Sequence, residues 1–349
     1  ADPDLPNKIR AGRPEDVWRC VYCNNCLAPN ADLFPGACSV NPFIYREQDY
    51  PPPGTKKPKK VMVVGGGLAG MRVAGLLAQR GHEVSLYEKS SKLGGQWNIA
   101  SVTPGQEGYA RLTEHLARSL DDNDVAVRTG VTVTKQMVAE MKPDAVVVAT
   151  GAVPLGLPVP GADAEHVVQA HDVLEGTAPV KGRIVVVGGR FTGMEVAIVL
   201  AEQGKDVCIV TQAGLGENGV KLEQMLFRTL ARRLLDLRVP LYLHSKVLEI
   251  GKQAVVMTLG DDIFSLAADT VVLAVGMRAE NKLAEELEGV VPELYTVGDC
   301  VTSVNRLNSA GTGGTSTSPS SDRSQPLTIS SMLPDNSVAA IIKSRLVRP

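Results

Sequence analysis

Short apolar runs and helical patterns alternate through most of this chain. Residues 61–64 form an apolar run of strand length, and a glycine-rich turn leads into residues 71–79, whose apolar positions follow a helical period. Residues 83–88 then form a second apolar strand. Strand, glycine turn, helix and strand in this order are typical of a βαβ unit with parallel strands. The same order recurs over residues 183–211, so the chain contains an internal repeat.

The repeat predicts an α/β fold with tandem Rossmann-like dinucleotide-binding domains, an arrangement that resembles the disulfide reductases. Two more apolar runs, residues 145–151 and 270–276, end in glycine, and each is interpreted as the last strand of its half. The expected organisation is a cysteine segment with its linker (1–57), one split domain (58–154 plus 271–349) and a second domain inserted into it (155–270).

The first glycine turn has the spacing of a dinucleotide site, with Gly65, Gly67 and Gly70 between strand and helix. The first glycine permits the tight turn, the second lets the backbone approach a pyrophosphate, and the third lets the helix pack closely. The helix N-terminus offers free N–H groups and its positive dipole end to phosphates. Glu88, at the tip of the second strand, can hydrogen-bond the ribose hydroxyls. We therefore expect a bound dinucleotide here.

The second glycine turn departs from this pattern. Gly188 and Gly193 occupy the first and third glycine positions, but Arg190 stands at the second. Its side chain either crowds the pyrophosphate or clamps a phosphate through the guanidinium. The following strand ends in Thr211 and Gln212, where an acid is typical of NAD sites and an arginine of NADP sites. Two interpretations stay open: a nicotinamide nucleotide site, and a dinucleotide fold that holds a static nucleotide or none.

Four cysteines near the start of the chain form one group. Cys20, Cys23 and Cys26 follow a CxxCxxC spacing, and Cys38 comes soon after. One tight loop can point three such thiolates at a common centre, and a fourth closes the shell of a metal ion or a [4Fe–4S] cluster. Zinc ribbons usually offer two separated CxxC pairs, so the spacing favours the cluster over structural zinc, which stays an alternative, as does disulfide pairing.

Composition narrows the classes of function. The chain has 349 residues and a formal net charge of −2, which gives no reason to expect nucleic acid or an anionic membrane surface. Aromatic residues make up 4%, so a stacking platform for bases is not expected. No apolar run approaches the roughly 20 residues that cross a bilayer. Six cysteines without a signal peptide indicate a reducing, cytoplasmic compartment. Because the chain begins at Ala1 rather than Met, we expect a processed chain, a subunit or a fragment.

Several motifs occur in a recognisable order. Ala-Asp-Pro-Asp-Leu-Pro, Gly-Arg-Pro-Glu-Asp-Val, Cys-x-x-Cys-Asn-x-Cys and Cys-Ser-Val-Asn-Pro precede the first glycine turn. Lys92-Leu-Gly-Gly-Gln96, Ala149-Thr-Gly151 and Gly298-Asp299 follow it. This series resembles the C-terminal part of the iron–sulfur flavoenzymes of the old-yellow-enzyme class, the family of 2,4-dienoyl-CoA reductase and trimethylamine dehydrogenase.

The resemblance implies three groups of binding residues. The iron–sulfur loop would hold a [4Fe–4S] cluster through Cys20, Cys23, Cys26 and Cys38. FAD would lie against Gly65, Gly67, Gly70, Glu88, Gln96, Val133, Gly151 and Asp299. A second site, for NAD(P)H or ADP, would be lined by Gly188, Gly193 and Glu195.

The FMN-bearing (βα)8 barrel of that family has no counterpart in this sequence. The residues that bind FMN and the small-molecule substrate are therefore expected on a partner polypeptide, in a hetero-oligomer, or on a barrel domain that has been removed from this chain. The resulting hypothesis is an electron relay between NAD(P)H, FAD, the cluster and the barrel partner, serving enoate or enoyl-CoA reduction or amine dehydrogenation. The alternative is a non-catalytic accessory subunit that holds the cluster and a static ADP or FAD.

Overall fold

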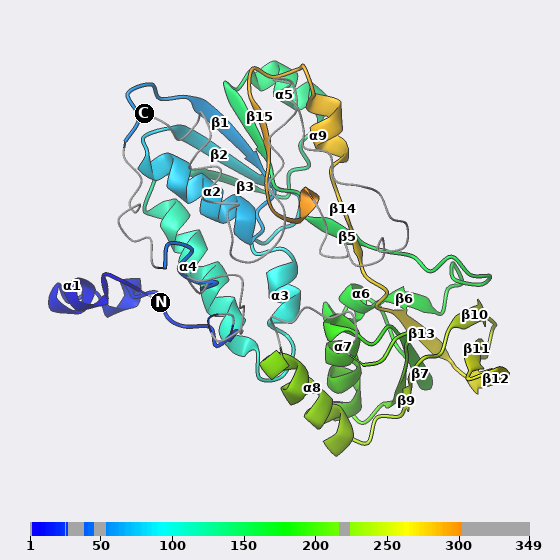
Figure 1. The fold of residues 1–349 in the computed structure, drawn as a ribbon. Coiled ribbons are helices and arrows are strands. Elements are labelled where there is room, and N and C mark those ends of the chain that lie inside the picture. Colours follow the sequence, from blue (N-terminus) through cyan, green and yellow to red (C-terminus); the bar gives the residue numbers. More distant parts are fainter. Residues whose placement is uncertain (1, 25, 27–37, 45–53, 216–223, 302–349) are drawn as a thin grey trace, which may run out of the picture.

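The computed structural model describes residues 2–24, 26, 38–44, 54–215 and 224–301, and Figure 1 shows their arrangement. Two parallel sheets with their helices form two lobes, which is the α/β architecture that the βαβ repeat predicts. The predicted fold class is confirmed. Within these ranges no helix has the length and apolar character needed to cross a membrane.

The first sheet has five parallel strands in the order β15-β4-β1-β2-β3. Alternate residues of the central strand β1 face opposite sides: Val61 and Val63 pack in one core, Met62 and Val64 in another. Helices α2 and α4 cover the first side, and α5 and α9 the second. The bounds are β1 Lys60–Val64, α2 Leu68–Gln79, β2 Glu83–Glu88, α4 Ala110–Asp121, β3 Ala126–Thr129, α5 Lys135–Met141, β4 Ala145–Val148, α9 Lys282–Leu287 and β15 Leu294–Thr296.

The second sheet repeats this plan with the parallel order β6-β13-β7-β8-β9. Helices α6, α7 and α8 pack on one side, while an antiparallel sheet of β10, β11 and β12 closes the other. The bounds are β6 Val167–Gln169, α6 Ala170–Leu174, β7 Arg183–Val187, α7 Phe191–Glu202, β8 Asp206–Val210, α8 Gln224–Asp236, β9 Leu241–Tyr242, β10 Val247–Ile250, β11 Ala254–Leu259, β12 Asp262–Ala267 and β13 Thr270–Leu273.

A two-stranded ribbon joins the lobes. Strand β5 (Ala152–Pro154) leaves the first lobe and pairs antiparallel with β14 (Met277–Ala279), which returns to it. The chain thus enters the second sheet after β5 and comes back to the first sheet at β15. The exact domain boundaries predicted above stay predictions, and the end of the split domain, residues 302–349, lies outside the described residues.

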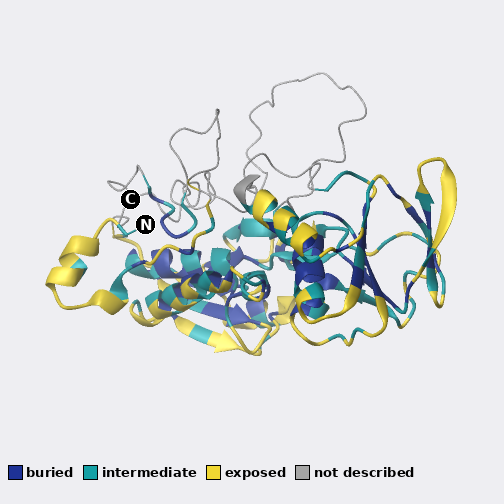
Figure 2. Ribbon diagram, turned by 90° about the horizontal axis from the view of Figure 1, so that it is seen from below, coloured by how far each residue is buried: buried dark blue, intermediate teal, exposed yellow. Residues whose placement is uncertain are grey.

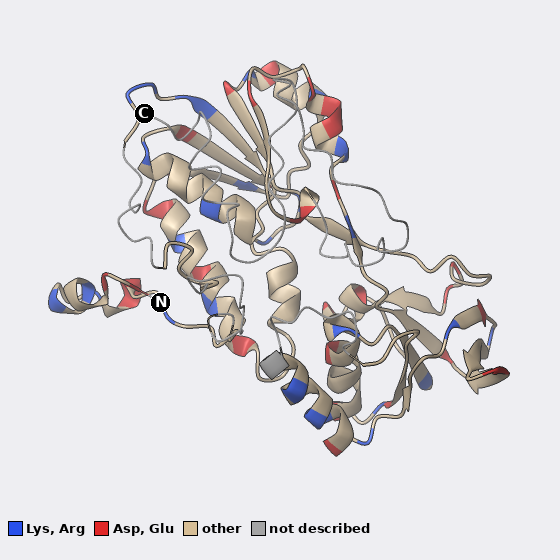
Figure 3. Ribbon diagram, viewed as in Figure 1, with Lys and Arg blue, Asp and Glu red and all other residues tan. Residues whose placement is uncertain are grey.

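The part of the first lobe that contacts the second lobe runs from helix α3 (Gln96–Ala100) to the turn η4 (Glu107–Tyr109). Ile99 of α3 belongs to the core formed by α7 and α8. Arg233 of α8 donates to the carbonyl of Pro104 at 3.4 Å and pairs with the carboxylate of Glu202. Figure 3 shows charged residues of both signs along α8. The two lobes therefore contact each other through apolar Ile99 and through Arg233, whose charge is paired with Glu202 of the second lobe.

The N-terminal segment begins with α1 (Leu5–Arg10) and the turn η1 (Pro14–Asp16). Helix α1 has no buried residue and projects from the first lobe (Figures 1 and 2). Trp18 anchors the segment: its ring lies 5.0 Å from the His115 ring on α4 and 5.6 Å from the Arg72 guanidinium on α2. The segment leading to the cysteines is thus fixed on the helices of the first lobe.

Candidate functional site

The first glycine turn is built by close backbone contacts. Gly65 has a φ of +109°, and a methyl group there would lie 2.3 Å from the carbonyl oxygen of Ala149. A methyl group at Gly70 would lie 1.9 Å from the carbonyl oxygen of Gly65. At Gly67, by contrast, no described atom lies within 4 Å of that position. The first and third glycines are needed by the turn itself, whereas the second faces open space at the N-terminus of α2, which suits a pyrophosphate.

The other residues expected around FAD surround this same helix end. Gly94 N–H donates to the carbonyl of Gly66 at 2.8 Å, which fixes the N-terminus of α3 beside the turn. Gln96, at the start of α3, donates from Nε2 to the carbonyl of Ala152 at 2.8 Å. Gly151 follows strand β4 with a φ of +74°, and a methyl group on it would lie 4.0 Å from Gln96 Nε2. A ring of short loops therefore frames the carboxyl edge of the first sheet.

Asp299 and Val133 complete this set. Asp299 lies in the turn η6 (Gly298–Cys300), where a methyl group on Gly298 would lie 2.9 Å from Ala69 Cβ in the first turn of α2. Val133 is buried in the same core as Val64 and Tyr87, at the side of β2. Both residues are thus brought to the elements that carry the first turn. Their roles toward FAD stay predictions.

Glu88 at the end of β2 is tied to the turn. Its Oε2 accepts a hydrogen bond from Gly66 N–H at 2.6 Å, and its Oε1 accepts one from Ser90 N–H at 2.7 Å. The residue is buried to 7% exposure. Each carboxylate oxygen keeps a second lone pair, so both can still accept a ribose hydroxyl. The predicted position of the acid at the strand tip is what the structure shows.

The second glycine turn has the same backbone. Gly188 has a φ of +119°, and a methyl group there would lie 2.3 Å from the carbonyl oxygen of Ala274. A methyl group on Gly193 would lie 1.9 Å from the Gly188 carbonyl oxygen. Arg190 caps α7 with φ −87° and ψ −176°, close to the −72° and −179° of Gly67. Since any residue adopts these extended values, Arg190 does not distort the turn.

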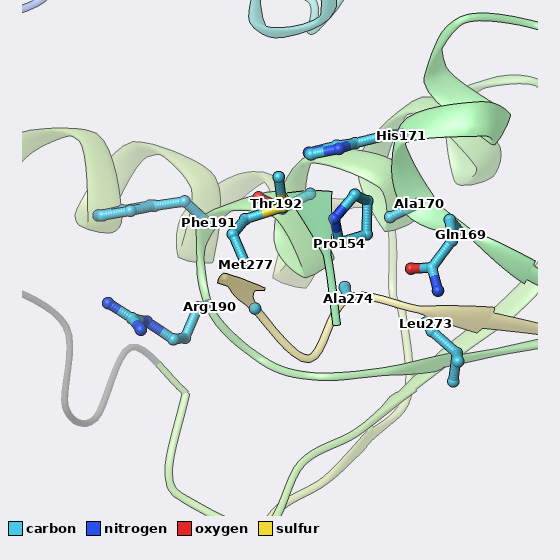
Figure 4. Close-up of a pocket in the computed structure, with 11 residues that line it drawn as sticks. Pro154, Gln169, Ala170, His171, Arg190, Phe191, Thr192, Leu273, Ala274 and Met277 are labelled. Carbon is cyan, nitrogen blue, oxygen red and sulfur yellow. The ribbon is translucent and has the colours of Figure 1, made fainter. Parts of the chain in front are cut away.

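A cavity of about 150 Å³ opens beside this turn, at the carboxyl end of β13. Figure 4 shows its lining, with His171 and Thr192 on one side and Arg190 and Phe191 extending together away from Gln169. Burial lowers the pKa of His171 despite the opposing carboxylates of Glu175 and Asp172, so its ring is held toward the neutral form. The remaining lining residues are Pro154, Ala170, Leu273, Ala274, Gly276 and Met277.

This cavity has the surroundings of a ligand site in an α/β fold: strand ends, a helix N-terminus and a few polar groups among apolar ones. Residues from both linking strands, Pro154 of β5 and Met277 of β14, contribute to it. The cavity therefore lies where the second lobe meets the ribbon that leads back to the first turn. His171, Thr192 and Gln169 were not found by sequence reasoning, because no local motif marks them.

Glu195 of α7 contacts a residue of the first lobe. It is 9% exposed, and its Oε1 accepts a hydrogen bond from Gln106 Nε2 of the first lobe at 2.9 Å. Gln106 is likewise buried, at 6% exposure. The pair joins the two lobes through a buried polar contact, which the sequence did not reveal. A role of Glu195 toward a nucleotide stays a prediction.

The predicted cysteine loop carries some features of a thiolate site. Cys20 Sγ accepts a hydrogen bond from Tyr22 N–H at 3.3 Å, and Cys38 Sγ accepts one from Asn41 N–H at 3.4 Å. Hydrogen bonds to sulfur of this kind tune thiolate ligands of iron–sulfur clusters. Cys23 donates to Ser39 Oγ at 3.2 Å, directly beside Cys38.

The four sulfurs nevertheless do not form a closed set. Among the described residues no three His, Cys, Asp or Glu side chains are grouped closely enough to hold a metal ion. Residues 27–37, between Cys26 and Cys38, lie outside the described residues, and none of the six cysteines forms a disulfide. The donor chemistry fits a cluster, but binding one requires the sulfurs to approach each other more closely. The cluster therefore stays a prediction from the spacing.

The two remaining cysteines are poor ligands and poor nucleophiles. Burial and the nearby Asp206 carboxylate raise the pKa of Cys208 to about 12. Burial also raises the pKa of Cys300, whose Sγ donates to the carbonyls of Val148 and Val297. Both thiols are held protonated, so neither is a candidate for thiolate chemistry.

Comparison with known proteins gives a consistent set of relatives. Residues 59–314 match the model of a family described as pyridine nucleotide-disulphide oxidoreductase. The chain is 33% identical to a metal reductase of Desulforamulus reducens, over 86% of this chain and 50% of the relative. It is 36% identical to an NADH oxidase of Thermoanaerobacter brockii, over 87% of this chain and 49% of the relative. The chain thus spans about half the length of the curated relatives it matches.

Solved structures that are similar to this chain include reductases. A 2-naphthoyl-CoA reductase complex matches with a TM-score of 0.80 and 30% identity, over 86% of this chain and 46% of that one. Thioredoxin reductase of Lactococcus lactis matches with a TM-score of 0.54 at 21% identity, over 69% of this chain and 90% of that one, which shows the shared fold alone. Curated relatives also include an alkene reductase/demethylase OYE of Caballeronia cordobensis, 29% identical over 82% of this chain and 43% of the relative. The resemblance inferred from the sequence motifs is confirmed.

Proposed function

The chain belongs to the pyridine nucleotide-disulphide oxidoreductase family, and from that premise we propose that it is the electron-transferring module of an iron–sulfur flavoprotein oxidoreductase. FAD is expected at the first turn, NAD(P)H at the second and a [4Fe–4S] cluster at the cysteine loop. When bound, FAD would supply two-electron chemistry toward NAD(P)H and one-electron chemistry toward the cluster. The protein's own work is to bind, orient and separate these groups.

One observation carries the proposal: the two glycine turns share a backbone geometry within one chain. In both, the first glycine N–H donates at 2.8 Å to the strand that follows, from Gly65 to Tyr87 and from Gly188 to Val210. In both, a helix of twelve residues starts at the turn and leaves its N-terminal N–H groups available. Two intact dinucleotide turns support a hydride donor at one and a flavin at the other.

The residues of the first turn have definable tasks. Gly67 leaves room for the pyrophosphate at the positive end of α2. Glu88 is preorganised by its two backbone hydrogen bonds and would accept the ribose hydroxyls. Gln96 is held by the carbonyl of Ala152, so its amide is oriented before the flavin arrives.

At the second turn the cavity beside α7 would receive the nicotinamide nucleotide. Arg190 brings a permanent cation to the helix end where a pyrophosphate would lie. Thr192 and His171 add neutral hydrogen-bonding groups to a mostly apolar lining. The mostly apolar lining would also reduce the contact of water with a bound nicotinamide ring.

The proposed partner is an FMN-binding (βα)8 barrel that carries the substrate pocket. Support comes from the half-length match and from the names of relatives, which include a cinnamate reductase of Clostridium sporogenes and a dimethylamine dehydrogenase of Hyphomicrobium. These names favour reduction of an activated alkene or oxidation of an amine on the partner. Four cysteines proposed as cluster ligands and two held as protonated thiols fit a reducing compartment, so the proposed location of the module is the cytoplasm.

The test is anaerobic reduction. The chain is purified with whatever copurifies, its flavin and iron contents are measured, and NADH or NADPH is added without oxygen. Loss of the visible flavin absorbance is expected with at least one of the two reduced nucleotides, whereas ADP at the same concentration should cause none. Bound FAD that stays oxidised after both additions would contradict the relay.

A second candidate function is a non-catalytic accessory subunit that holds the cluster and a static ADP or FAD. The Arg190 side chain at the position of the second glycine favours it, because a clamped phosphate exchanges slowly. Tight ADP that survives purification, together with unreduced FAD, is the result this candidate requires. A structural zinc ion in place of the cluster would appear as zinc without iron or acid-labile sulfide.

A further inference from the structure

The internal repeat allows a direct comparison of the two strand tips that follow the glycine turns. Glu88 and Thr211 occupy the same place: a methyl group on Gly66 would lie 3.0 Å from Glu88 Cβ, and one on Gly189 would lie 2.9 Å from Thr211 Cβ. Both residues are buried to the same extent, at 7% exposure. The second turn therefore differs from the first at this position in side-chain chemistry, not in backbone.

That difference removes a negative charge. At the first turn the Glu88 carboxylate accepts the Gly66 N–H, so its charge is fixed against the turn. At the second turn Thr211 offers a hydroxyl and no carboxylate, and its own N–H donates to the carbonyl of Tyr242. The Gly189 N–H therefore faces a neutral side chain. In the first turn the equivalent N–H, that of Gly66, is used by the Glu88 carboxylate, whereas no described carboxylate of the second turn uses the Gly189 N–H.

The acid at this strand tip selects between the two nicotinamide nucleotides. A carboxylate hydrogen-bonds the 2′-hydroxyl of the adenosine ribose and repels the 2′-phosphate that distinguishes NADPH. A neutral threonine does not repel the 2′-phosphate, and its hydroxyl can hydrogen-bond either a 2′-hydroxyl or a 2′-phosphate. The cation of Arg190, one residue beyond Gly189, adds positive charge to the same turn. The electrostatic penalty against a 2′-phosphate is thus absent from the described part of this turn.

We propose that the second site accepts NADPH as well as NADH, and that Thr211 is the residue that leaves the 2′-position undiscriminated. This inference rests on the proposed function, which puts a nicotinamide nucleotide at the second turn. It adds the class of nucleotide and the residue responsible. Glu88 shows that the same backbone holds a carboxylate without distortion, so a glutamate at 211 is expected to fold.

The experiment measures the dissociation constants of NAD⁺ and NADP⁺ by calorimetry on the purified protein with its copurifying partner. The wild-type constants are expected to agree within about tenfold. Thr211→Glu should weaken NADP⁺ by roughly 100-fold while leaving NAD⁺ within about threefold. Thr211→Gln is the matched control, because it has the size of glutamate without its charge, and its ratio of constants should stay near that of the wild type.

Different outcomes contradict the inference and the proposed function. A wild-type preference of more than about 100-fold for either nucleotide overturns the inference but leaves the relay intact. Thr211→Glu and Thr211→Gln giving the same ratio of constants also overturns it, since charge at 211 would then not matter. If neither nucleotide binds and neither reduced form bleaches the flavin, the proposed function fails and the inference fails with it. A thermal melt of each variant shows whether it is folded.

Discussion

The Trp97 ring stacks on the Tyr109 ring, with centroids 4.6 Å apart and planes 15° from parallel, and its indole N–H donates to the Tyr109 carbonyl at 2.7 Å. Trp97 follows Gln96 directly, so the stack begins beside the first turn. Its other end reaches the cysteine loop, because a methyl group on the neighbouring Gly108 would lie 3.5 Å from the Val21 carbonyl oxygen. The stack thus connects the proposed flavin site with the proposed cluster loop.

Flavin binding should quench Trp97 selectively. The chain has two tryptophans, so with excitation that selects tryptophan the Trp18→Phe variant reports on Trp97 and the Trp97→Phe variant reports on Trp18. Because quenching falls steeply with distance, adding FAD to the apoprotein should reduce the emission of the Trp18→Phe variant far more than that of the Trp97→Phe variant. Equal quenching in the two variants, with FAD uptake confirmed by absorbance, would show that the flavin does not lie beside α3.

Two glycine substitutions should separate folding from FAD binding. Gly65→Ala forces an alanine to a φ of +109° and against the Ala149 carbonyl, so it should destabilise the apoprotein by about 2 kcal/mol or more. In Gly67→Ala the added methyl group meets no described atom within 4 Å, and the φ of −72° is allowed for alanine. The free energy of unfolding of the apoprotein should therefore stay within about 0.5 kcal/mol of the wild-type value.

The FAD affinity of the Gly67→Ala variant should nevertheless fall, because the added methyl group occupies space that the pyrophosphate needs. Chemical denaturation of the apoprotein and titration with FAD make the two measurements. Unchanged FAD affinity in a folded Gly67→Ala variant would show that the pyrophosphate of FAD does not bind at this turn.

Acid should loosen the attachment of the N-terminal segment. Burial lowers the pKa of His115 to about 4, with Arg72, Lys8 and Arg118 adding to the effect and Asp2 opposing it. A histidine whose pKa is lower in the folded state than its ordinary 6.5 favours folding above pH 6.5. That stability is lost as the pH falls from 6.5 toward 4, because the unfolded chain takes up the proton first.

The size of this effect should be about 1 kcal/mol after allowance for partial exposure. His115→Phe keeps an aromatic ring beside Trp18 and removes the titration, so the decline in unfolding free energy between pH 6.5 and 4 should be shallower. Urea denaturation at several pH values measures it. Parallel declines in both proteins would mean that other groups control this range.

Loss of one loop cysteine should remove iron without affecting the first turn. Cys20→Ser is expected to lower iron and acid-labile sulfide to background, because three thiolates hold a [4Fe–4S] cluster poorly. Cys208→Ser is the matched control, since that thiol is held protonated within β8. Flavin bleaching by NADH should survive in both variants. Iron retained in full by the Cys20→Ser variant would exclude this residue as a ligand.

The helices and strands and the geometry of the first glycine turn could be predicted from the sequence alone. Apolar runs of strand length, helical spacing and glycines at fixed intervals are local signals, and Gly65, Gly70 and Glu88 have the contacts that their positions predicted. Local rules suffice there because a βαβ turn is made by residues close together in the chain.

The effect of Arg190 on the second turn and the partner of Glu195 became clear only from the folded chain. The sequence left open whether Arg190 disrupts the second turn, and its extended backbone shows that it does not. The hydrogen bond between Gln106 and Glu195 joins residues that are 89 positions apart in the sequence. Such contacts depend on how whole elements pack, and no spacing along the chain encodes that packing. The cysteine loop shows the same limit. The CxxCxxC spacing predicts a cluster, but whether the four sulfurs come close enough to hold it depends on how the loop folds.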